Sequence, residues 1–348
     1  TFMMCLVYCI TAIILLFIAQ SCQKPIKNEN SSSYVFTWVK DENDWNSDYV
    51  AVINSDPKDQ GYGSLVSTLP VGFNDINAHH SEHRFHEIKE LFVNGFSGGR
   101  SFIVDLNDPK HPKLKKTFTN INQYTFPHSF ERLPNGNVLA TFQTVGQGNN
   151  QVGGLVEISP EGDFVRSSNA SDPKVAEFIR PYSLAILPEI DRVVSTSADM
   201  KQKDLSNVVQ VWSLSNLSLI KTMVLEPGPR GNEHFDPAEP RVLEDGKTVL
   251  ISTFFCGLYR VKDIESRAPS IEWVYSFDFN DKYDCAIPVV NGDYWIQAVG
   301  SKTAIVSLNV SNPSKPTKAF ELKFNTGEWP HWIAVSYTHL RAHETSRY

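Results

Sequence analysis

The clearest structural pattern of this 348-residue chain lies in Phe126-Pro-His-Ser-Phe-Glu-Arg-Leu-Pro-Asn-Gly-Asn-Val-Leu-Ala-Thr-Phe142. Residues 129–133 form a short extended run, and residues 134–137 (Pro-Asn-Gly-Asn) have the chemistry of a tight turn. Proline presets φ, while Asn and Gly accept positive φ, so the chain reverses here at little steric cost. Residues 138–142 are apolar or β-branched. The segment therefore predicts two antiparallel strands joined by a turn.

Weaker copies of this pattern recur along the chain, and they begin at Ala78, Pro181, Pro237, Cys285 and Pro330. Their period of roughly 45 to 55 residues is the range of four-stranded propeller blades. Two further strand-like runs separate the copies, for example residues 101–105 and 114–118. Four strands in each repeat and no long helical pattern predict an all-β protein, a β-propeller.

The two ends of the propeller are expected to meet. Residues 34–39, 49–53 and 64–69 read as three strands without a leading copy of the pattern. Propellers commonly close their ring within one blade, so we expect a strand of this blade to come from the far C-terminus. This blade, five complete copies and the start at Trp329 predict a seven-bladed β-propeller over residues 34–335, with its last blade truncated.

The C-terminal residues 336–348 carry neither the turn nor the strand of the repeat. We interpret them as a non-native tail, resembling translated adapter sequence. His339 and His343, four residues apart, would suit two ligands on a helix, but in such a tail they have no role.

The N-terminal residues predict export. Residues 2–18 are almost wholly apolar and uncharged, and small residues precede Cys22, so residues 1–22 read as a signal peptide. The segment resembles a bacterial lipoprotein signal, in which Cys22 would receive the lipid; an ordinary secretory peptide or an uncleaved anchor is the alternative. Residues 23–33 are polar and read as a flexible tether. A periplasmic or outer-membrane lipoprotein, held to the membrane only through Cys22, is expected.

The bulk composition is that of a globular protein. Hydrophobic residues make up 41% of the chain, which is ample for a large core, and the formal charge is −7. This acidic balance, without a Lys- or Arg-rich face, gives no support to nucleic-acid binding.

Two cysteines fall in the globular part, Cys256 and Cys285, in consecutive repeats. In an exported protein they could join as a disulfide. Two buried free thiols are an equal alternative, and a metal-binding role ranks third.

Histidines occupy, in three of the repeats, the position that leads into the innermost strand. Innermost strands line a propeller's channel, so equivalent positions converge in space. That position holds His128 and His331, each after a proline, and the first repeat offers His79 and His80. Several imidazoles on one axis suit copper, with zinc as the alternative. A single histidine at a strand start is usually an ordinary hydrogen-bonded side chain, so the prediction of a metal site rests on the set.

Two further histidines follow closely, His83 and His86. A helix would place His79, His83 and His86 on one face as a local metal site. The repeat register favours a strand, which leaves His83 and His86 exposed to solvent. Other repeats bring Tyr182, Asp236 and Asp284 near the same axis.

Several motifs resemble the selenium-binding protein family, over about residues 34–335. They are Tyr34-Val-Phe-Thr-Trp38, Asp48-Tyr-Val-Ala-Val-Ile-Asn-Ser-Asp-Pro57, Ala78-His-His-Ser-Glu82, Phe126-Pro-His-Ser-Phe130, Asp236-Pro-Ala-Glu-Pro-Arg241, Phe255-Cys-Gly-Leu-Tyr-Arg260 and Pro330-His-Trp332. The resemblance implies a seven-bladed propeller. The better-known members are copper-dependent methanethiol oxidases, which convert methanethiol and O₂ to formaldehyde, hydrogen peroxide and hydrogen sulfide. It also implies the metal ligands His79, His80, His128 and His331, with Glu82 and Glu239 as acid–base residues or as residues that orient the ligands.

The sequence departs from the family pattern at two places. Ser81-Glu-His-Arg-Phe-His86 replaces the family's cysteine-containing segment, so selenium binding through that thiol is not expected. Asp236 stands where another histidine would be expected, with His234 two residues earlier. These departures leave open whether the metal set and the substrate are those of the family.

Two functions of different classes remain open. The first is an exported copper-dependent oxidase of a small thiol, using O₂ and giving an aldehyde, hydrogen peroxide and sulfide. The second is a non-catalytic propeller lipoprotein, a binding scaffold whose histidines only line the channel. The sequence names no protein partner.

Overall fold

The structure is a computed structural model that describes residues 33–41, 45–74, 76–82, 89–95, 97, 99–148, 150–200, 204–278, 284–325, 327–336 and 339–345. The predicted signal peptide, all but the last residue of the predicted tether, and the pair His83 and His86 lie outside these ranges. Within the described ranges, no helix is long and apolar enough to cross a membrane.

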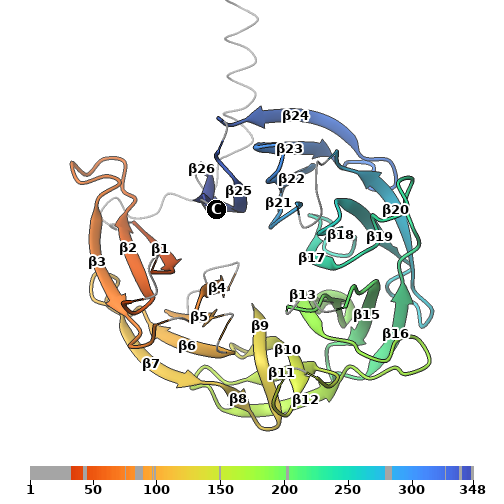
Figure 1. Ribbon diagram of the computed structural model, residues 1–348, viewed down its shortest axis with the longest axis horizontal. Helices are drawn as coiled ribbons and strands as arrows, with labels where there is room; N and C mark the ends of the chain where they lie inside the picture. The colour runs from red at the N-terminus through yellow and green to blue at the C-terminus, as the bar shows by residue number, and fades with distance from the viewer. Residues whose placement is uncertain are drawn as a thin grey trace, which may run out of the picture.

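The strands form seven antiparallel sheets, arranged in chain order around a ring (Figure 1). The first sheets contain β1 (Tyr34–Val39), β2 (Tyr49–Asn54) and β3 (Leu65–Pro70); β4 (Ala78–Ser81), β5 (Glu90–Gly95), β6 (Arg100–Asp105) and β7 (Lys113–Phe118); and β8 (Asn120–Ile121), β9 (Tyr124–Arg132), β10 (Val138–Val145), β11 (Gly154–Ile158) and β12 (Phe164–Asn169).

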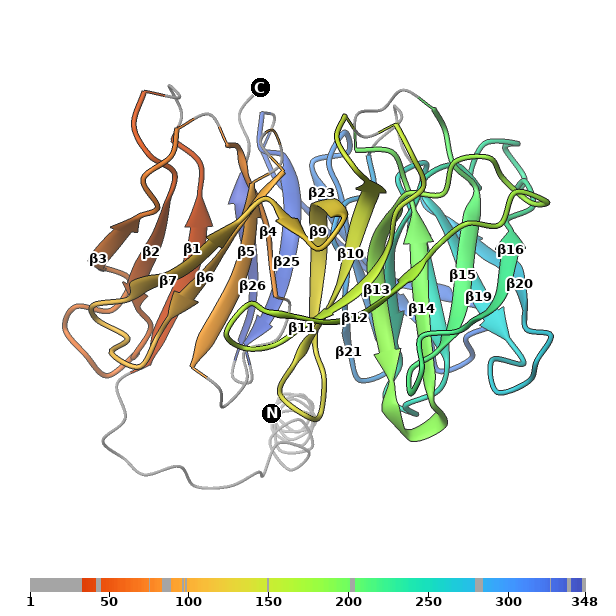
Figure 2. The same ribbon diagram turned by 90° about the horizontal axis from the view of Figure 1, so that it is seen from below.

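The later sheets contain β13 (Pro181–Leu187), β14 (Arg192–Ser197), β15 (Val208–Ser213) and β16 (Leu219–Val224); β17 (Pro237–Val242), β18 (Val249–Thr253), β19 (Gly257–Lys262) and β20 (Ser270–Ser276); β21 (Val289–Asn291), β22 (Tyr294–Val299), β23 (Ala304–Asn309) and β24 (Thr317–Lys323); and β25 (Pro330–Ser336) and β26 (His339–Thr345). One short 3-10 helix, η1 (Pro188–Ile190), precedes β14. Seen from the side, inner and middle strands such as β13 and β14 run roughly along the axis of the ring, whereas outer strands such as β7 and β12 run obliquely to it (Figure 2).

The strand–turn–strand segment that organises the sequence is confirmed. β9 and β10 pair antiparallel, with Val138 opposite Arg132. The turn is closed by a hydrogen bond from the Leu133 amide to the carbonyl oxygen of Asn137, 2.8 Å long, and Gly136 has a φ of 89°. Glycine tolerates this left-handed conformation without steric cost.

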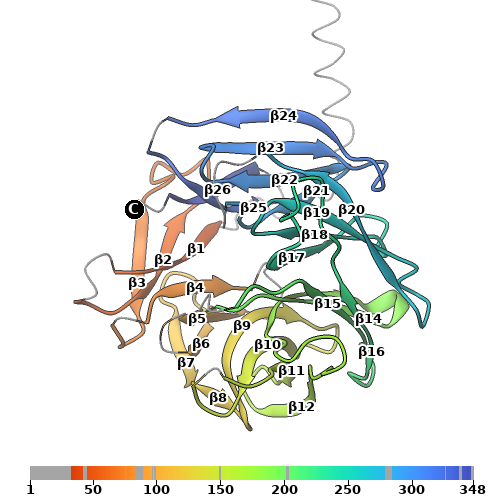
Figure 3. The same cartoon turned by 45° about the vertical axis from the view of Figure 1, so that its right-hand side comes forward.

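The all-β propeller is confirmed, but the predicted number of blades is wrong. Six sheets have three or more strands, five of them complete and one, β1–β3, with three strands. Among the described residues, β25 and β26 follow β24, and they make a two-stranded sheet instead of a seventh blade. β25 packs against β21 and β22, on the side of the ring that opens toward β1 (Figures 1 and 3).

The C-terminal end differs from the expectation in two further ways. Among the described strands β1 pairs only with β2, so no C-terminal strand completes the first blade. The backbone of β26 pairs with β25, although no strand was expected after Val335. The non-native origin of residues 336–348 stays a prediction.

The core lies between neighbouring blades. Each adjacent pair shares a cluster of buried apolar side chains: for example, Phe92 and Ile103 pack with Phe130 and Phe142 between the second and third blades. Central strands such as β10 and β11 are buried along almost their whole length, so both of their faces pack against other parts of the protein. Each such side chain contributes about 1.5–3 kcal/mol when fully buried. This packing fixes where the inner strands stand relative to one another.

A disulfide links two blades, which resolves the three alternatives for the cysteines. Cys256, in the turn after β18, is bonded to Cys285, which lies 29 residues later and just before β21. Both are fully buried. The bond therefore ties the β17–β20 sheet to the chain that enters the β21–β24 sheet.

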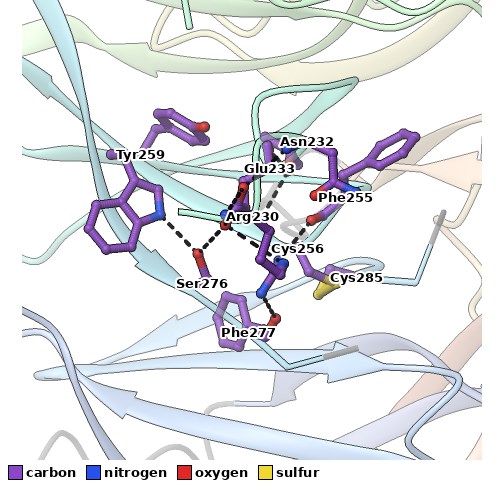
Figure 4. A network of polar contacts seen from close by, with 12 residues as sticks. Arg230, Asn232, Glu233, Phe255, Cys256, Tyr259, Ser276, Phe277 and Cys285 are labelled. Atoms are coloured by element: carbon purple, nitrogen blue, oxygen red, sulfur yellow. Dashed lines mark hydrogen bonds and ion pairs between the residues drawn. A yellow bond between two sulfur atoms is a disulfide. The ribbon is translucent and has the colours of Figure 1, made fainter. Parts of the chain in front are cut away.

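A network of polar contacts surrounds this disulfide (Figure 4). The guanidinium of Arg230 donates to the carbonyl oxygens of Phe255 and Phe277, at 3.3 and 2.9 Å. The buried carboxylate of Glu233 accepts hydrogen bonds from the Arg230 amide and from the hydroxyl of Ser276, at 2.9 and 2.8 Å. The long loop between β16 and β17 is thereby anchored beside the disulfide.

Replacing both cysteines by alanine should lower the free energy of unfolding by about 3–4 kcal/mol, because a loop of this length gains that much entropy in the unfolded chain. Urea unfolding of both proteins, with and without a thiol reductant, measures the effect. Reductant should shift the midpoint of the wild type toward that of the C256A/C285A variant and leave the variant unchanged. A wild type insensitive to reductant after full unfolding would contradict the disulfide.

Candidate metal centre

The inner strands carry a β-bulge at equivalent places. The pairing with the next strand shifts register between Ala78 and Ser81 in β4, Pro127 and Phe130 in β9, Pro181 and Leu184 in β13, and Pro237 and Glu239 in β17. Consecutive side chains of a regular strand point to opposite faces, whereas a bulge re-aims one of them. In β4 the adjacent rings of His79 and His80 thus lie together, with centroids 4.3 Å apart.

Three of the four predicted ligands form one cluster. The ligand nitrogens of His79, His80 and His128 all lie within 4.8 Å of one another, and we call these three residues the histidine cluster. The Nε2 atoms of His79 and His128 are 3.1 Å apart. His80 and His128 are buried, and His79 is half-buried. The cluster sits on β4 and β9, two of the innermost strands of the ring (Figure 1).

The orientation of the His128 ring is set by the next blade. Its Nδ1 lies 2.6 Å from the carbonyl oxygen of Tyr182. A carbonyl only accepts, so Nδ1 carries the proton of the neutral ring, and Nε2, which faces His79, carries the lone pair. A backbone acceptor on the far nitrogen is the usual arrangement for a metal-binding histidine.

His331, the fourth predicted ligand, lies beside the cluster without being part of it. It stands on β25, where its imidazole contributes to the lowered pKa of His79 and partly opposes the rise in the pKa of Glu239. Its neighbour Trp332 has its ring centroid 5.0 Å from that of His80. The repeat register therefore brought His331 to the correct region, and the position of β25 sets how close it comes.

Two members of the histidine cluster, His79 and His128, are uncharged at neutral pH. Burial lowers the pKa of His128 to about 3, and the hydrogen bond to Tyr182 only partly opposes this. Burial, followed by the neighbouring His128 and His331, holds the pKa of His79 well below its usual range. Neutral imidazole is the form that binds metal ions, since the lone pair must be free of a proton.

These residues fit a copper or zinc ion. Two nitrogens that bind one ion at about 2.0–2.1 Å can lie at most roughly 4.2 Å apart. The 3.1 Å between the Nε2 atoms of His79 and His128 falls inside this limit. An imidazole donor set suits copper and zinc and does not suit calcium or magnesium.

The two predicted acid–base residues occupy different surroundings. Glu82 is buried in an ion pair with Arg132 at 2.9 Å and accepts the Phe92 amide hydrogen bond. Burial raises its pKa, and Arg132 opposes this. The contacts of Glu82 thus tie β4 to β5 and β9, and none of them involves the histidine cluster.

Glu239, unlike Glu82, interacts electrostatically with residues beside the histidine cluster. It is fully buried, and its Oε2 accepts hydrogen bonds from Ser183 and Arg241 at 2.9 and 2.8 Å. Burial raises its pKa, and Arg241, Ser183 and His331 oppose this. Its charge in turn helps to raise the pKa of Tyr182, after burial of that phenol. Glu239 therefore faces both His331 and Tyr182.

Sequence reasoning gave no role to two aromatic residues and one amide. Tyr182 lies with its ring centroid 3.8 Å from His128, and Trp332 flanks His80. Asn94 on β5 hydrogen-bonds to the backbone of both histidine-bearing strands. An alignment of the second strands of the repeats could have found Asn94, because Thr141 and Thr196 occupy the same position.

The fold and the cluster define a β-propeller with a buried histidine centre at its axis. No family model matches the chain. A methanethiol oxidase from Hyphomicrobium sp is 30% identical over 161 residues, which is 43% of this chain and 35% of the relative. The match thus spans about a third of that relative's length.

Solved structures show the same fold. A hypothetical selenium-binding protein from Sulfolobus tokodaii superposes with a TM-score of 0.67 at 14% identity, covering 85% of this chain and 76% of that chain. A protein from Lactobacillus plantarum gives 0.60 at 9% identity, covering 83% and 81%. Together with the methanethiol oxidase match, these findings confirm the resemblance to the selenium-binding protein and methanethiol oxidase family.

The depressed pKa of His128 predicts that the metal-free protein loses stability in acid. Its pKa is about 3 when folded, against an ordinary value of 6.5, so in this window the unfolded chain binds a proton that the folded chain does not. At pH 5 this difference costs about 2 kcal/mol of unfolding free energy, and His79 adds to the loss. Urea unfolding at pH 7 and pH 5 should show a smaller loss for His128→Gln than for the wild type.

The exposed His111, in a turn with Asp108, provides the control. His111→Ala should retain the full acid sensitivity. An equal loss in the wild type and His128→Gln would contradict a neutral, buried His128.

Proposed function

We propose that this protein oxidises a small thiol with O₂ at a copper ion held by the histidine cluster. The observation that carries the proposal is the cluster itself, three imidazoles gathered on two of the innermost strands of the propeller. The similarity to methanethiol oxidase supports a thiol as the substrate class. For methanethiol the balanced reaction is CH₃SH + O₂ + H₂O → HCHO + H₂S + H₂O₂.

Copper fits this reaction better than zinc. Zinc has no redox chemistry, whereas the reaction removes two electrons from carbon and delivers them to O₂. Bound copper would act as a Lewis acid for the thiolate and as a carrier of electrons. His79, His80 and His128 would hold it, and His331 is the neighbouring side chain that could complete the set.

Glu239 is the carboxyl group we assign to proton transfer. Binding as thiolate requires the thiol to lose a proton, and a buried carboxylate with a raised pKa is suited to accept it. Ser183 and Arg241 hold one of its oxygens and so fix its orientation. Glu82, held by Arg132, would instead keep β4 in place.

An apolar cluster beside the histidines suits a small alkyl group. Tyr182, Ala198 and Ala238 are buried together, and Met200 and Phe254 pack against them. Tyr182 links this cluster to His128, since their rings are in contact. The alkyl part of a thiol would lose water there at little cost, whereas a charged substrate would not.

Export to an oxidising compartment is part of the same proposal. Disulfides persist in secreted and periplasmic proteins and are rare in the cytosol. The buried Cys256–Cys285 bond supports the export that the N-terminal residues predict.

Metal analysis of the purified protein is the first test. We expect about one copper ion per chain, lost in His79→Ala, His80→Ala and His128→Ala because each removes a ligand. His111→Ala, which changes an exposed histidine of a turn, is the matched control and should keep the metal. Protein that folds normally and binds no copper under aerobic reconstitution would instead favour the non-catalytic scaffold.

Thiol-dependent formation of hydrogen peroxide is the second test. Glu239→Gln should reduce kcat by about 10²-fold or more, because glutamine has nearly the same shape as glutamate but cannot accept the proton. Glu82→Gln is the matched change in the other buried Glu–Arg pair, and it should reduce thermal stability with little effect on kcat. The assignment fails if Glu82→Gln abolishes turnover and Glu239→Gln does not.

A further inference from the structure

We propose that Asn94 is a positioning residue of the metal centre: its side-chain amide holds the two histidine-bearing strands at a fixed separation. The inference rests on the proposed metal site but not on the oxidase reaction. It concerns a residue that touches only backbone and therefore acts through His80 and His128.

The contacts of Asn94 use every polar atom of its amide. The side chain is 1% exposed. Its Oδ1 accepts the hydrogen bond of the His80 backbone N–H at 2.6 Å. Its Nδ2 donates to the carbonyl oxygens of Pro127 and His128, both at 2.9 Å. An N–H and two carbonyls can be satisfied only by the oxygen and the nitrogen respectively, so the orientation of the amide is fixed by its partners.

These contacts hold the backbone on both sides of His128, one of the proposed metal ligands. The carbonyls of Pro127 and His128 belong to the peptide groups that precede and follow the His128 residue. The third contact holds the amide of His80 in the neighbouring blade. One rigid planar group therefore links the backbones of His80 and His128, at the two bulges that aim their rings.

In the next two blades a threonine occupies the position of Asn94 and makes a simpler link between neighbouring inner strands. We call each such side-chain link a clasp. Thr141 accepts the Ser129 amide hydrogen bond at 3.0 Å and donates to the Tyr182 carbonyl at 2.7 Å.

Thr196 repeats the arrangement one blade further. Its hydroxyl accepts from the Ser183 amide at 3.0 Å and donates to the Ala238 carbonyl at 2.6 Å. A hydroxyl offers one donor, which Thr196 shares between the Ala238 carbonyl and the more distant Ser183 carbonyl at 3.3 Å, whereas the Asn94 amide offers two. The doubled clasp stands between β4 and β9, the two strands that carry the histidine cluster.

Residues that orient metal ligands typically change metal affinity by 10–100-fold when removed. Without the Asn94 amide the Glu82–Arg132 ion pair would still tie β4 to β9, but the two bulges would lose the polar link between their backbones. The nitrogens of His80 and His128 would then sample a wider range of separations, and the ion would have to restrict them on binding. A purely structural clasp would instead change stability alone.

The test measures Zn²⁺ affinity by chelator competition, using the full chain and the metal alone as probe. Asn94→Ala should weaken Zn²⁺ binding by about 10–100-fold. Asn94→Thr, which restores the hydroxyl clasp of the other blades, should fold well and lose less affinity. Thr196→Ala removes the equivalent clasp between blades without histidines, and should lower the melting temperature while leaving the affinity unchanged.

The absorption bands of bound Co²⁺ give a second readout, because they report ligand geometry. They should change in both Asn94 variants and stay unchanged in Thr196→Ala. The inference is overturned if Asn94→Ala has the affinity and spectrum of the wild type, or if Thr196→Ala weakens binding as much as Asn94→Ala does. A wild type that binds no metal overturns the proposed function as well, so the two failures are distinguishable.

Discussion

The β-bulges of neighbouring inner strands are linked by hydrogen bonds through side chains of the second strands. Asn94, Thr141 and Thr196 each accept the amide of a bulge in their own blade and donate to the bulge of the next. Buried backbone groups left without partners would cost about 1–3 kcal/mol each, so this relay is also a requirement of burial. The Asn94 link of this relay fixes where the rings of His80 and His128 lie.

Burying three imidazoles beside one another carries a cost that the fold must meet. Desolvation opposes their protonated forms, which is why the pKa values of His79 and His128 fall. A bound metal ion would offset this cost by giving the lone pairs a partner. The apolar packing between blades provides the stability against which such a site can be built.

The two buried Glu–Arg pairs show how similar chemistry serves different ends. Glu82 and Glu239 both have a raised pKa through burial, and each is paired with an arginine. Glu82 contacts strands of its own blade and of the next blade. For Glu239, His331 is one of the neighbours that change the pKa. A perturbed pKa alone therefore does not identify a functional carboxyl group, and its neighbours must be considered.

The sequence by itself determined the strands, the turns and the blade repeat, because these depend on local chemistry such as the Pro-Asn-Gly-Asn turn at residues 134–137. It also placed His79, His80 and His128 at equivalent positions, from which their convergence follows. Only the tertiary structure decided that six blades form, that Cys256 and Cys285 are bonded, and that His331 stands beside the cluster. These features depend on how distant strands pack and on bulges that turn single side chains. The local pattern of residues specifies neither.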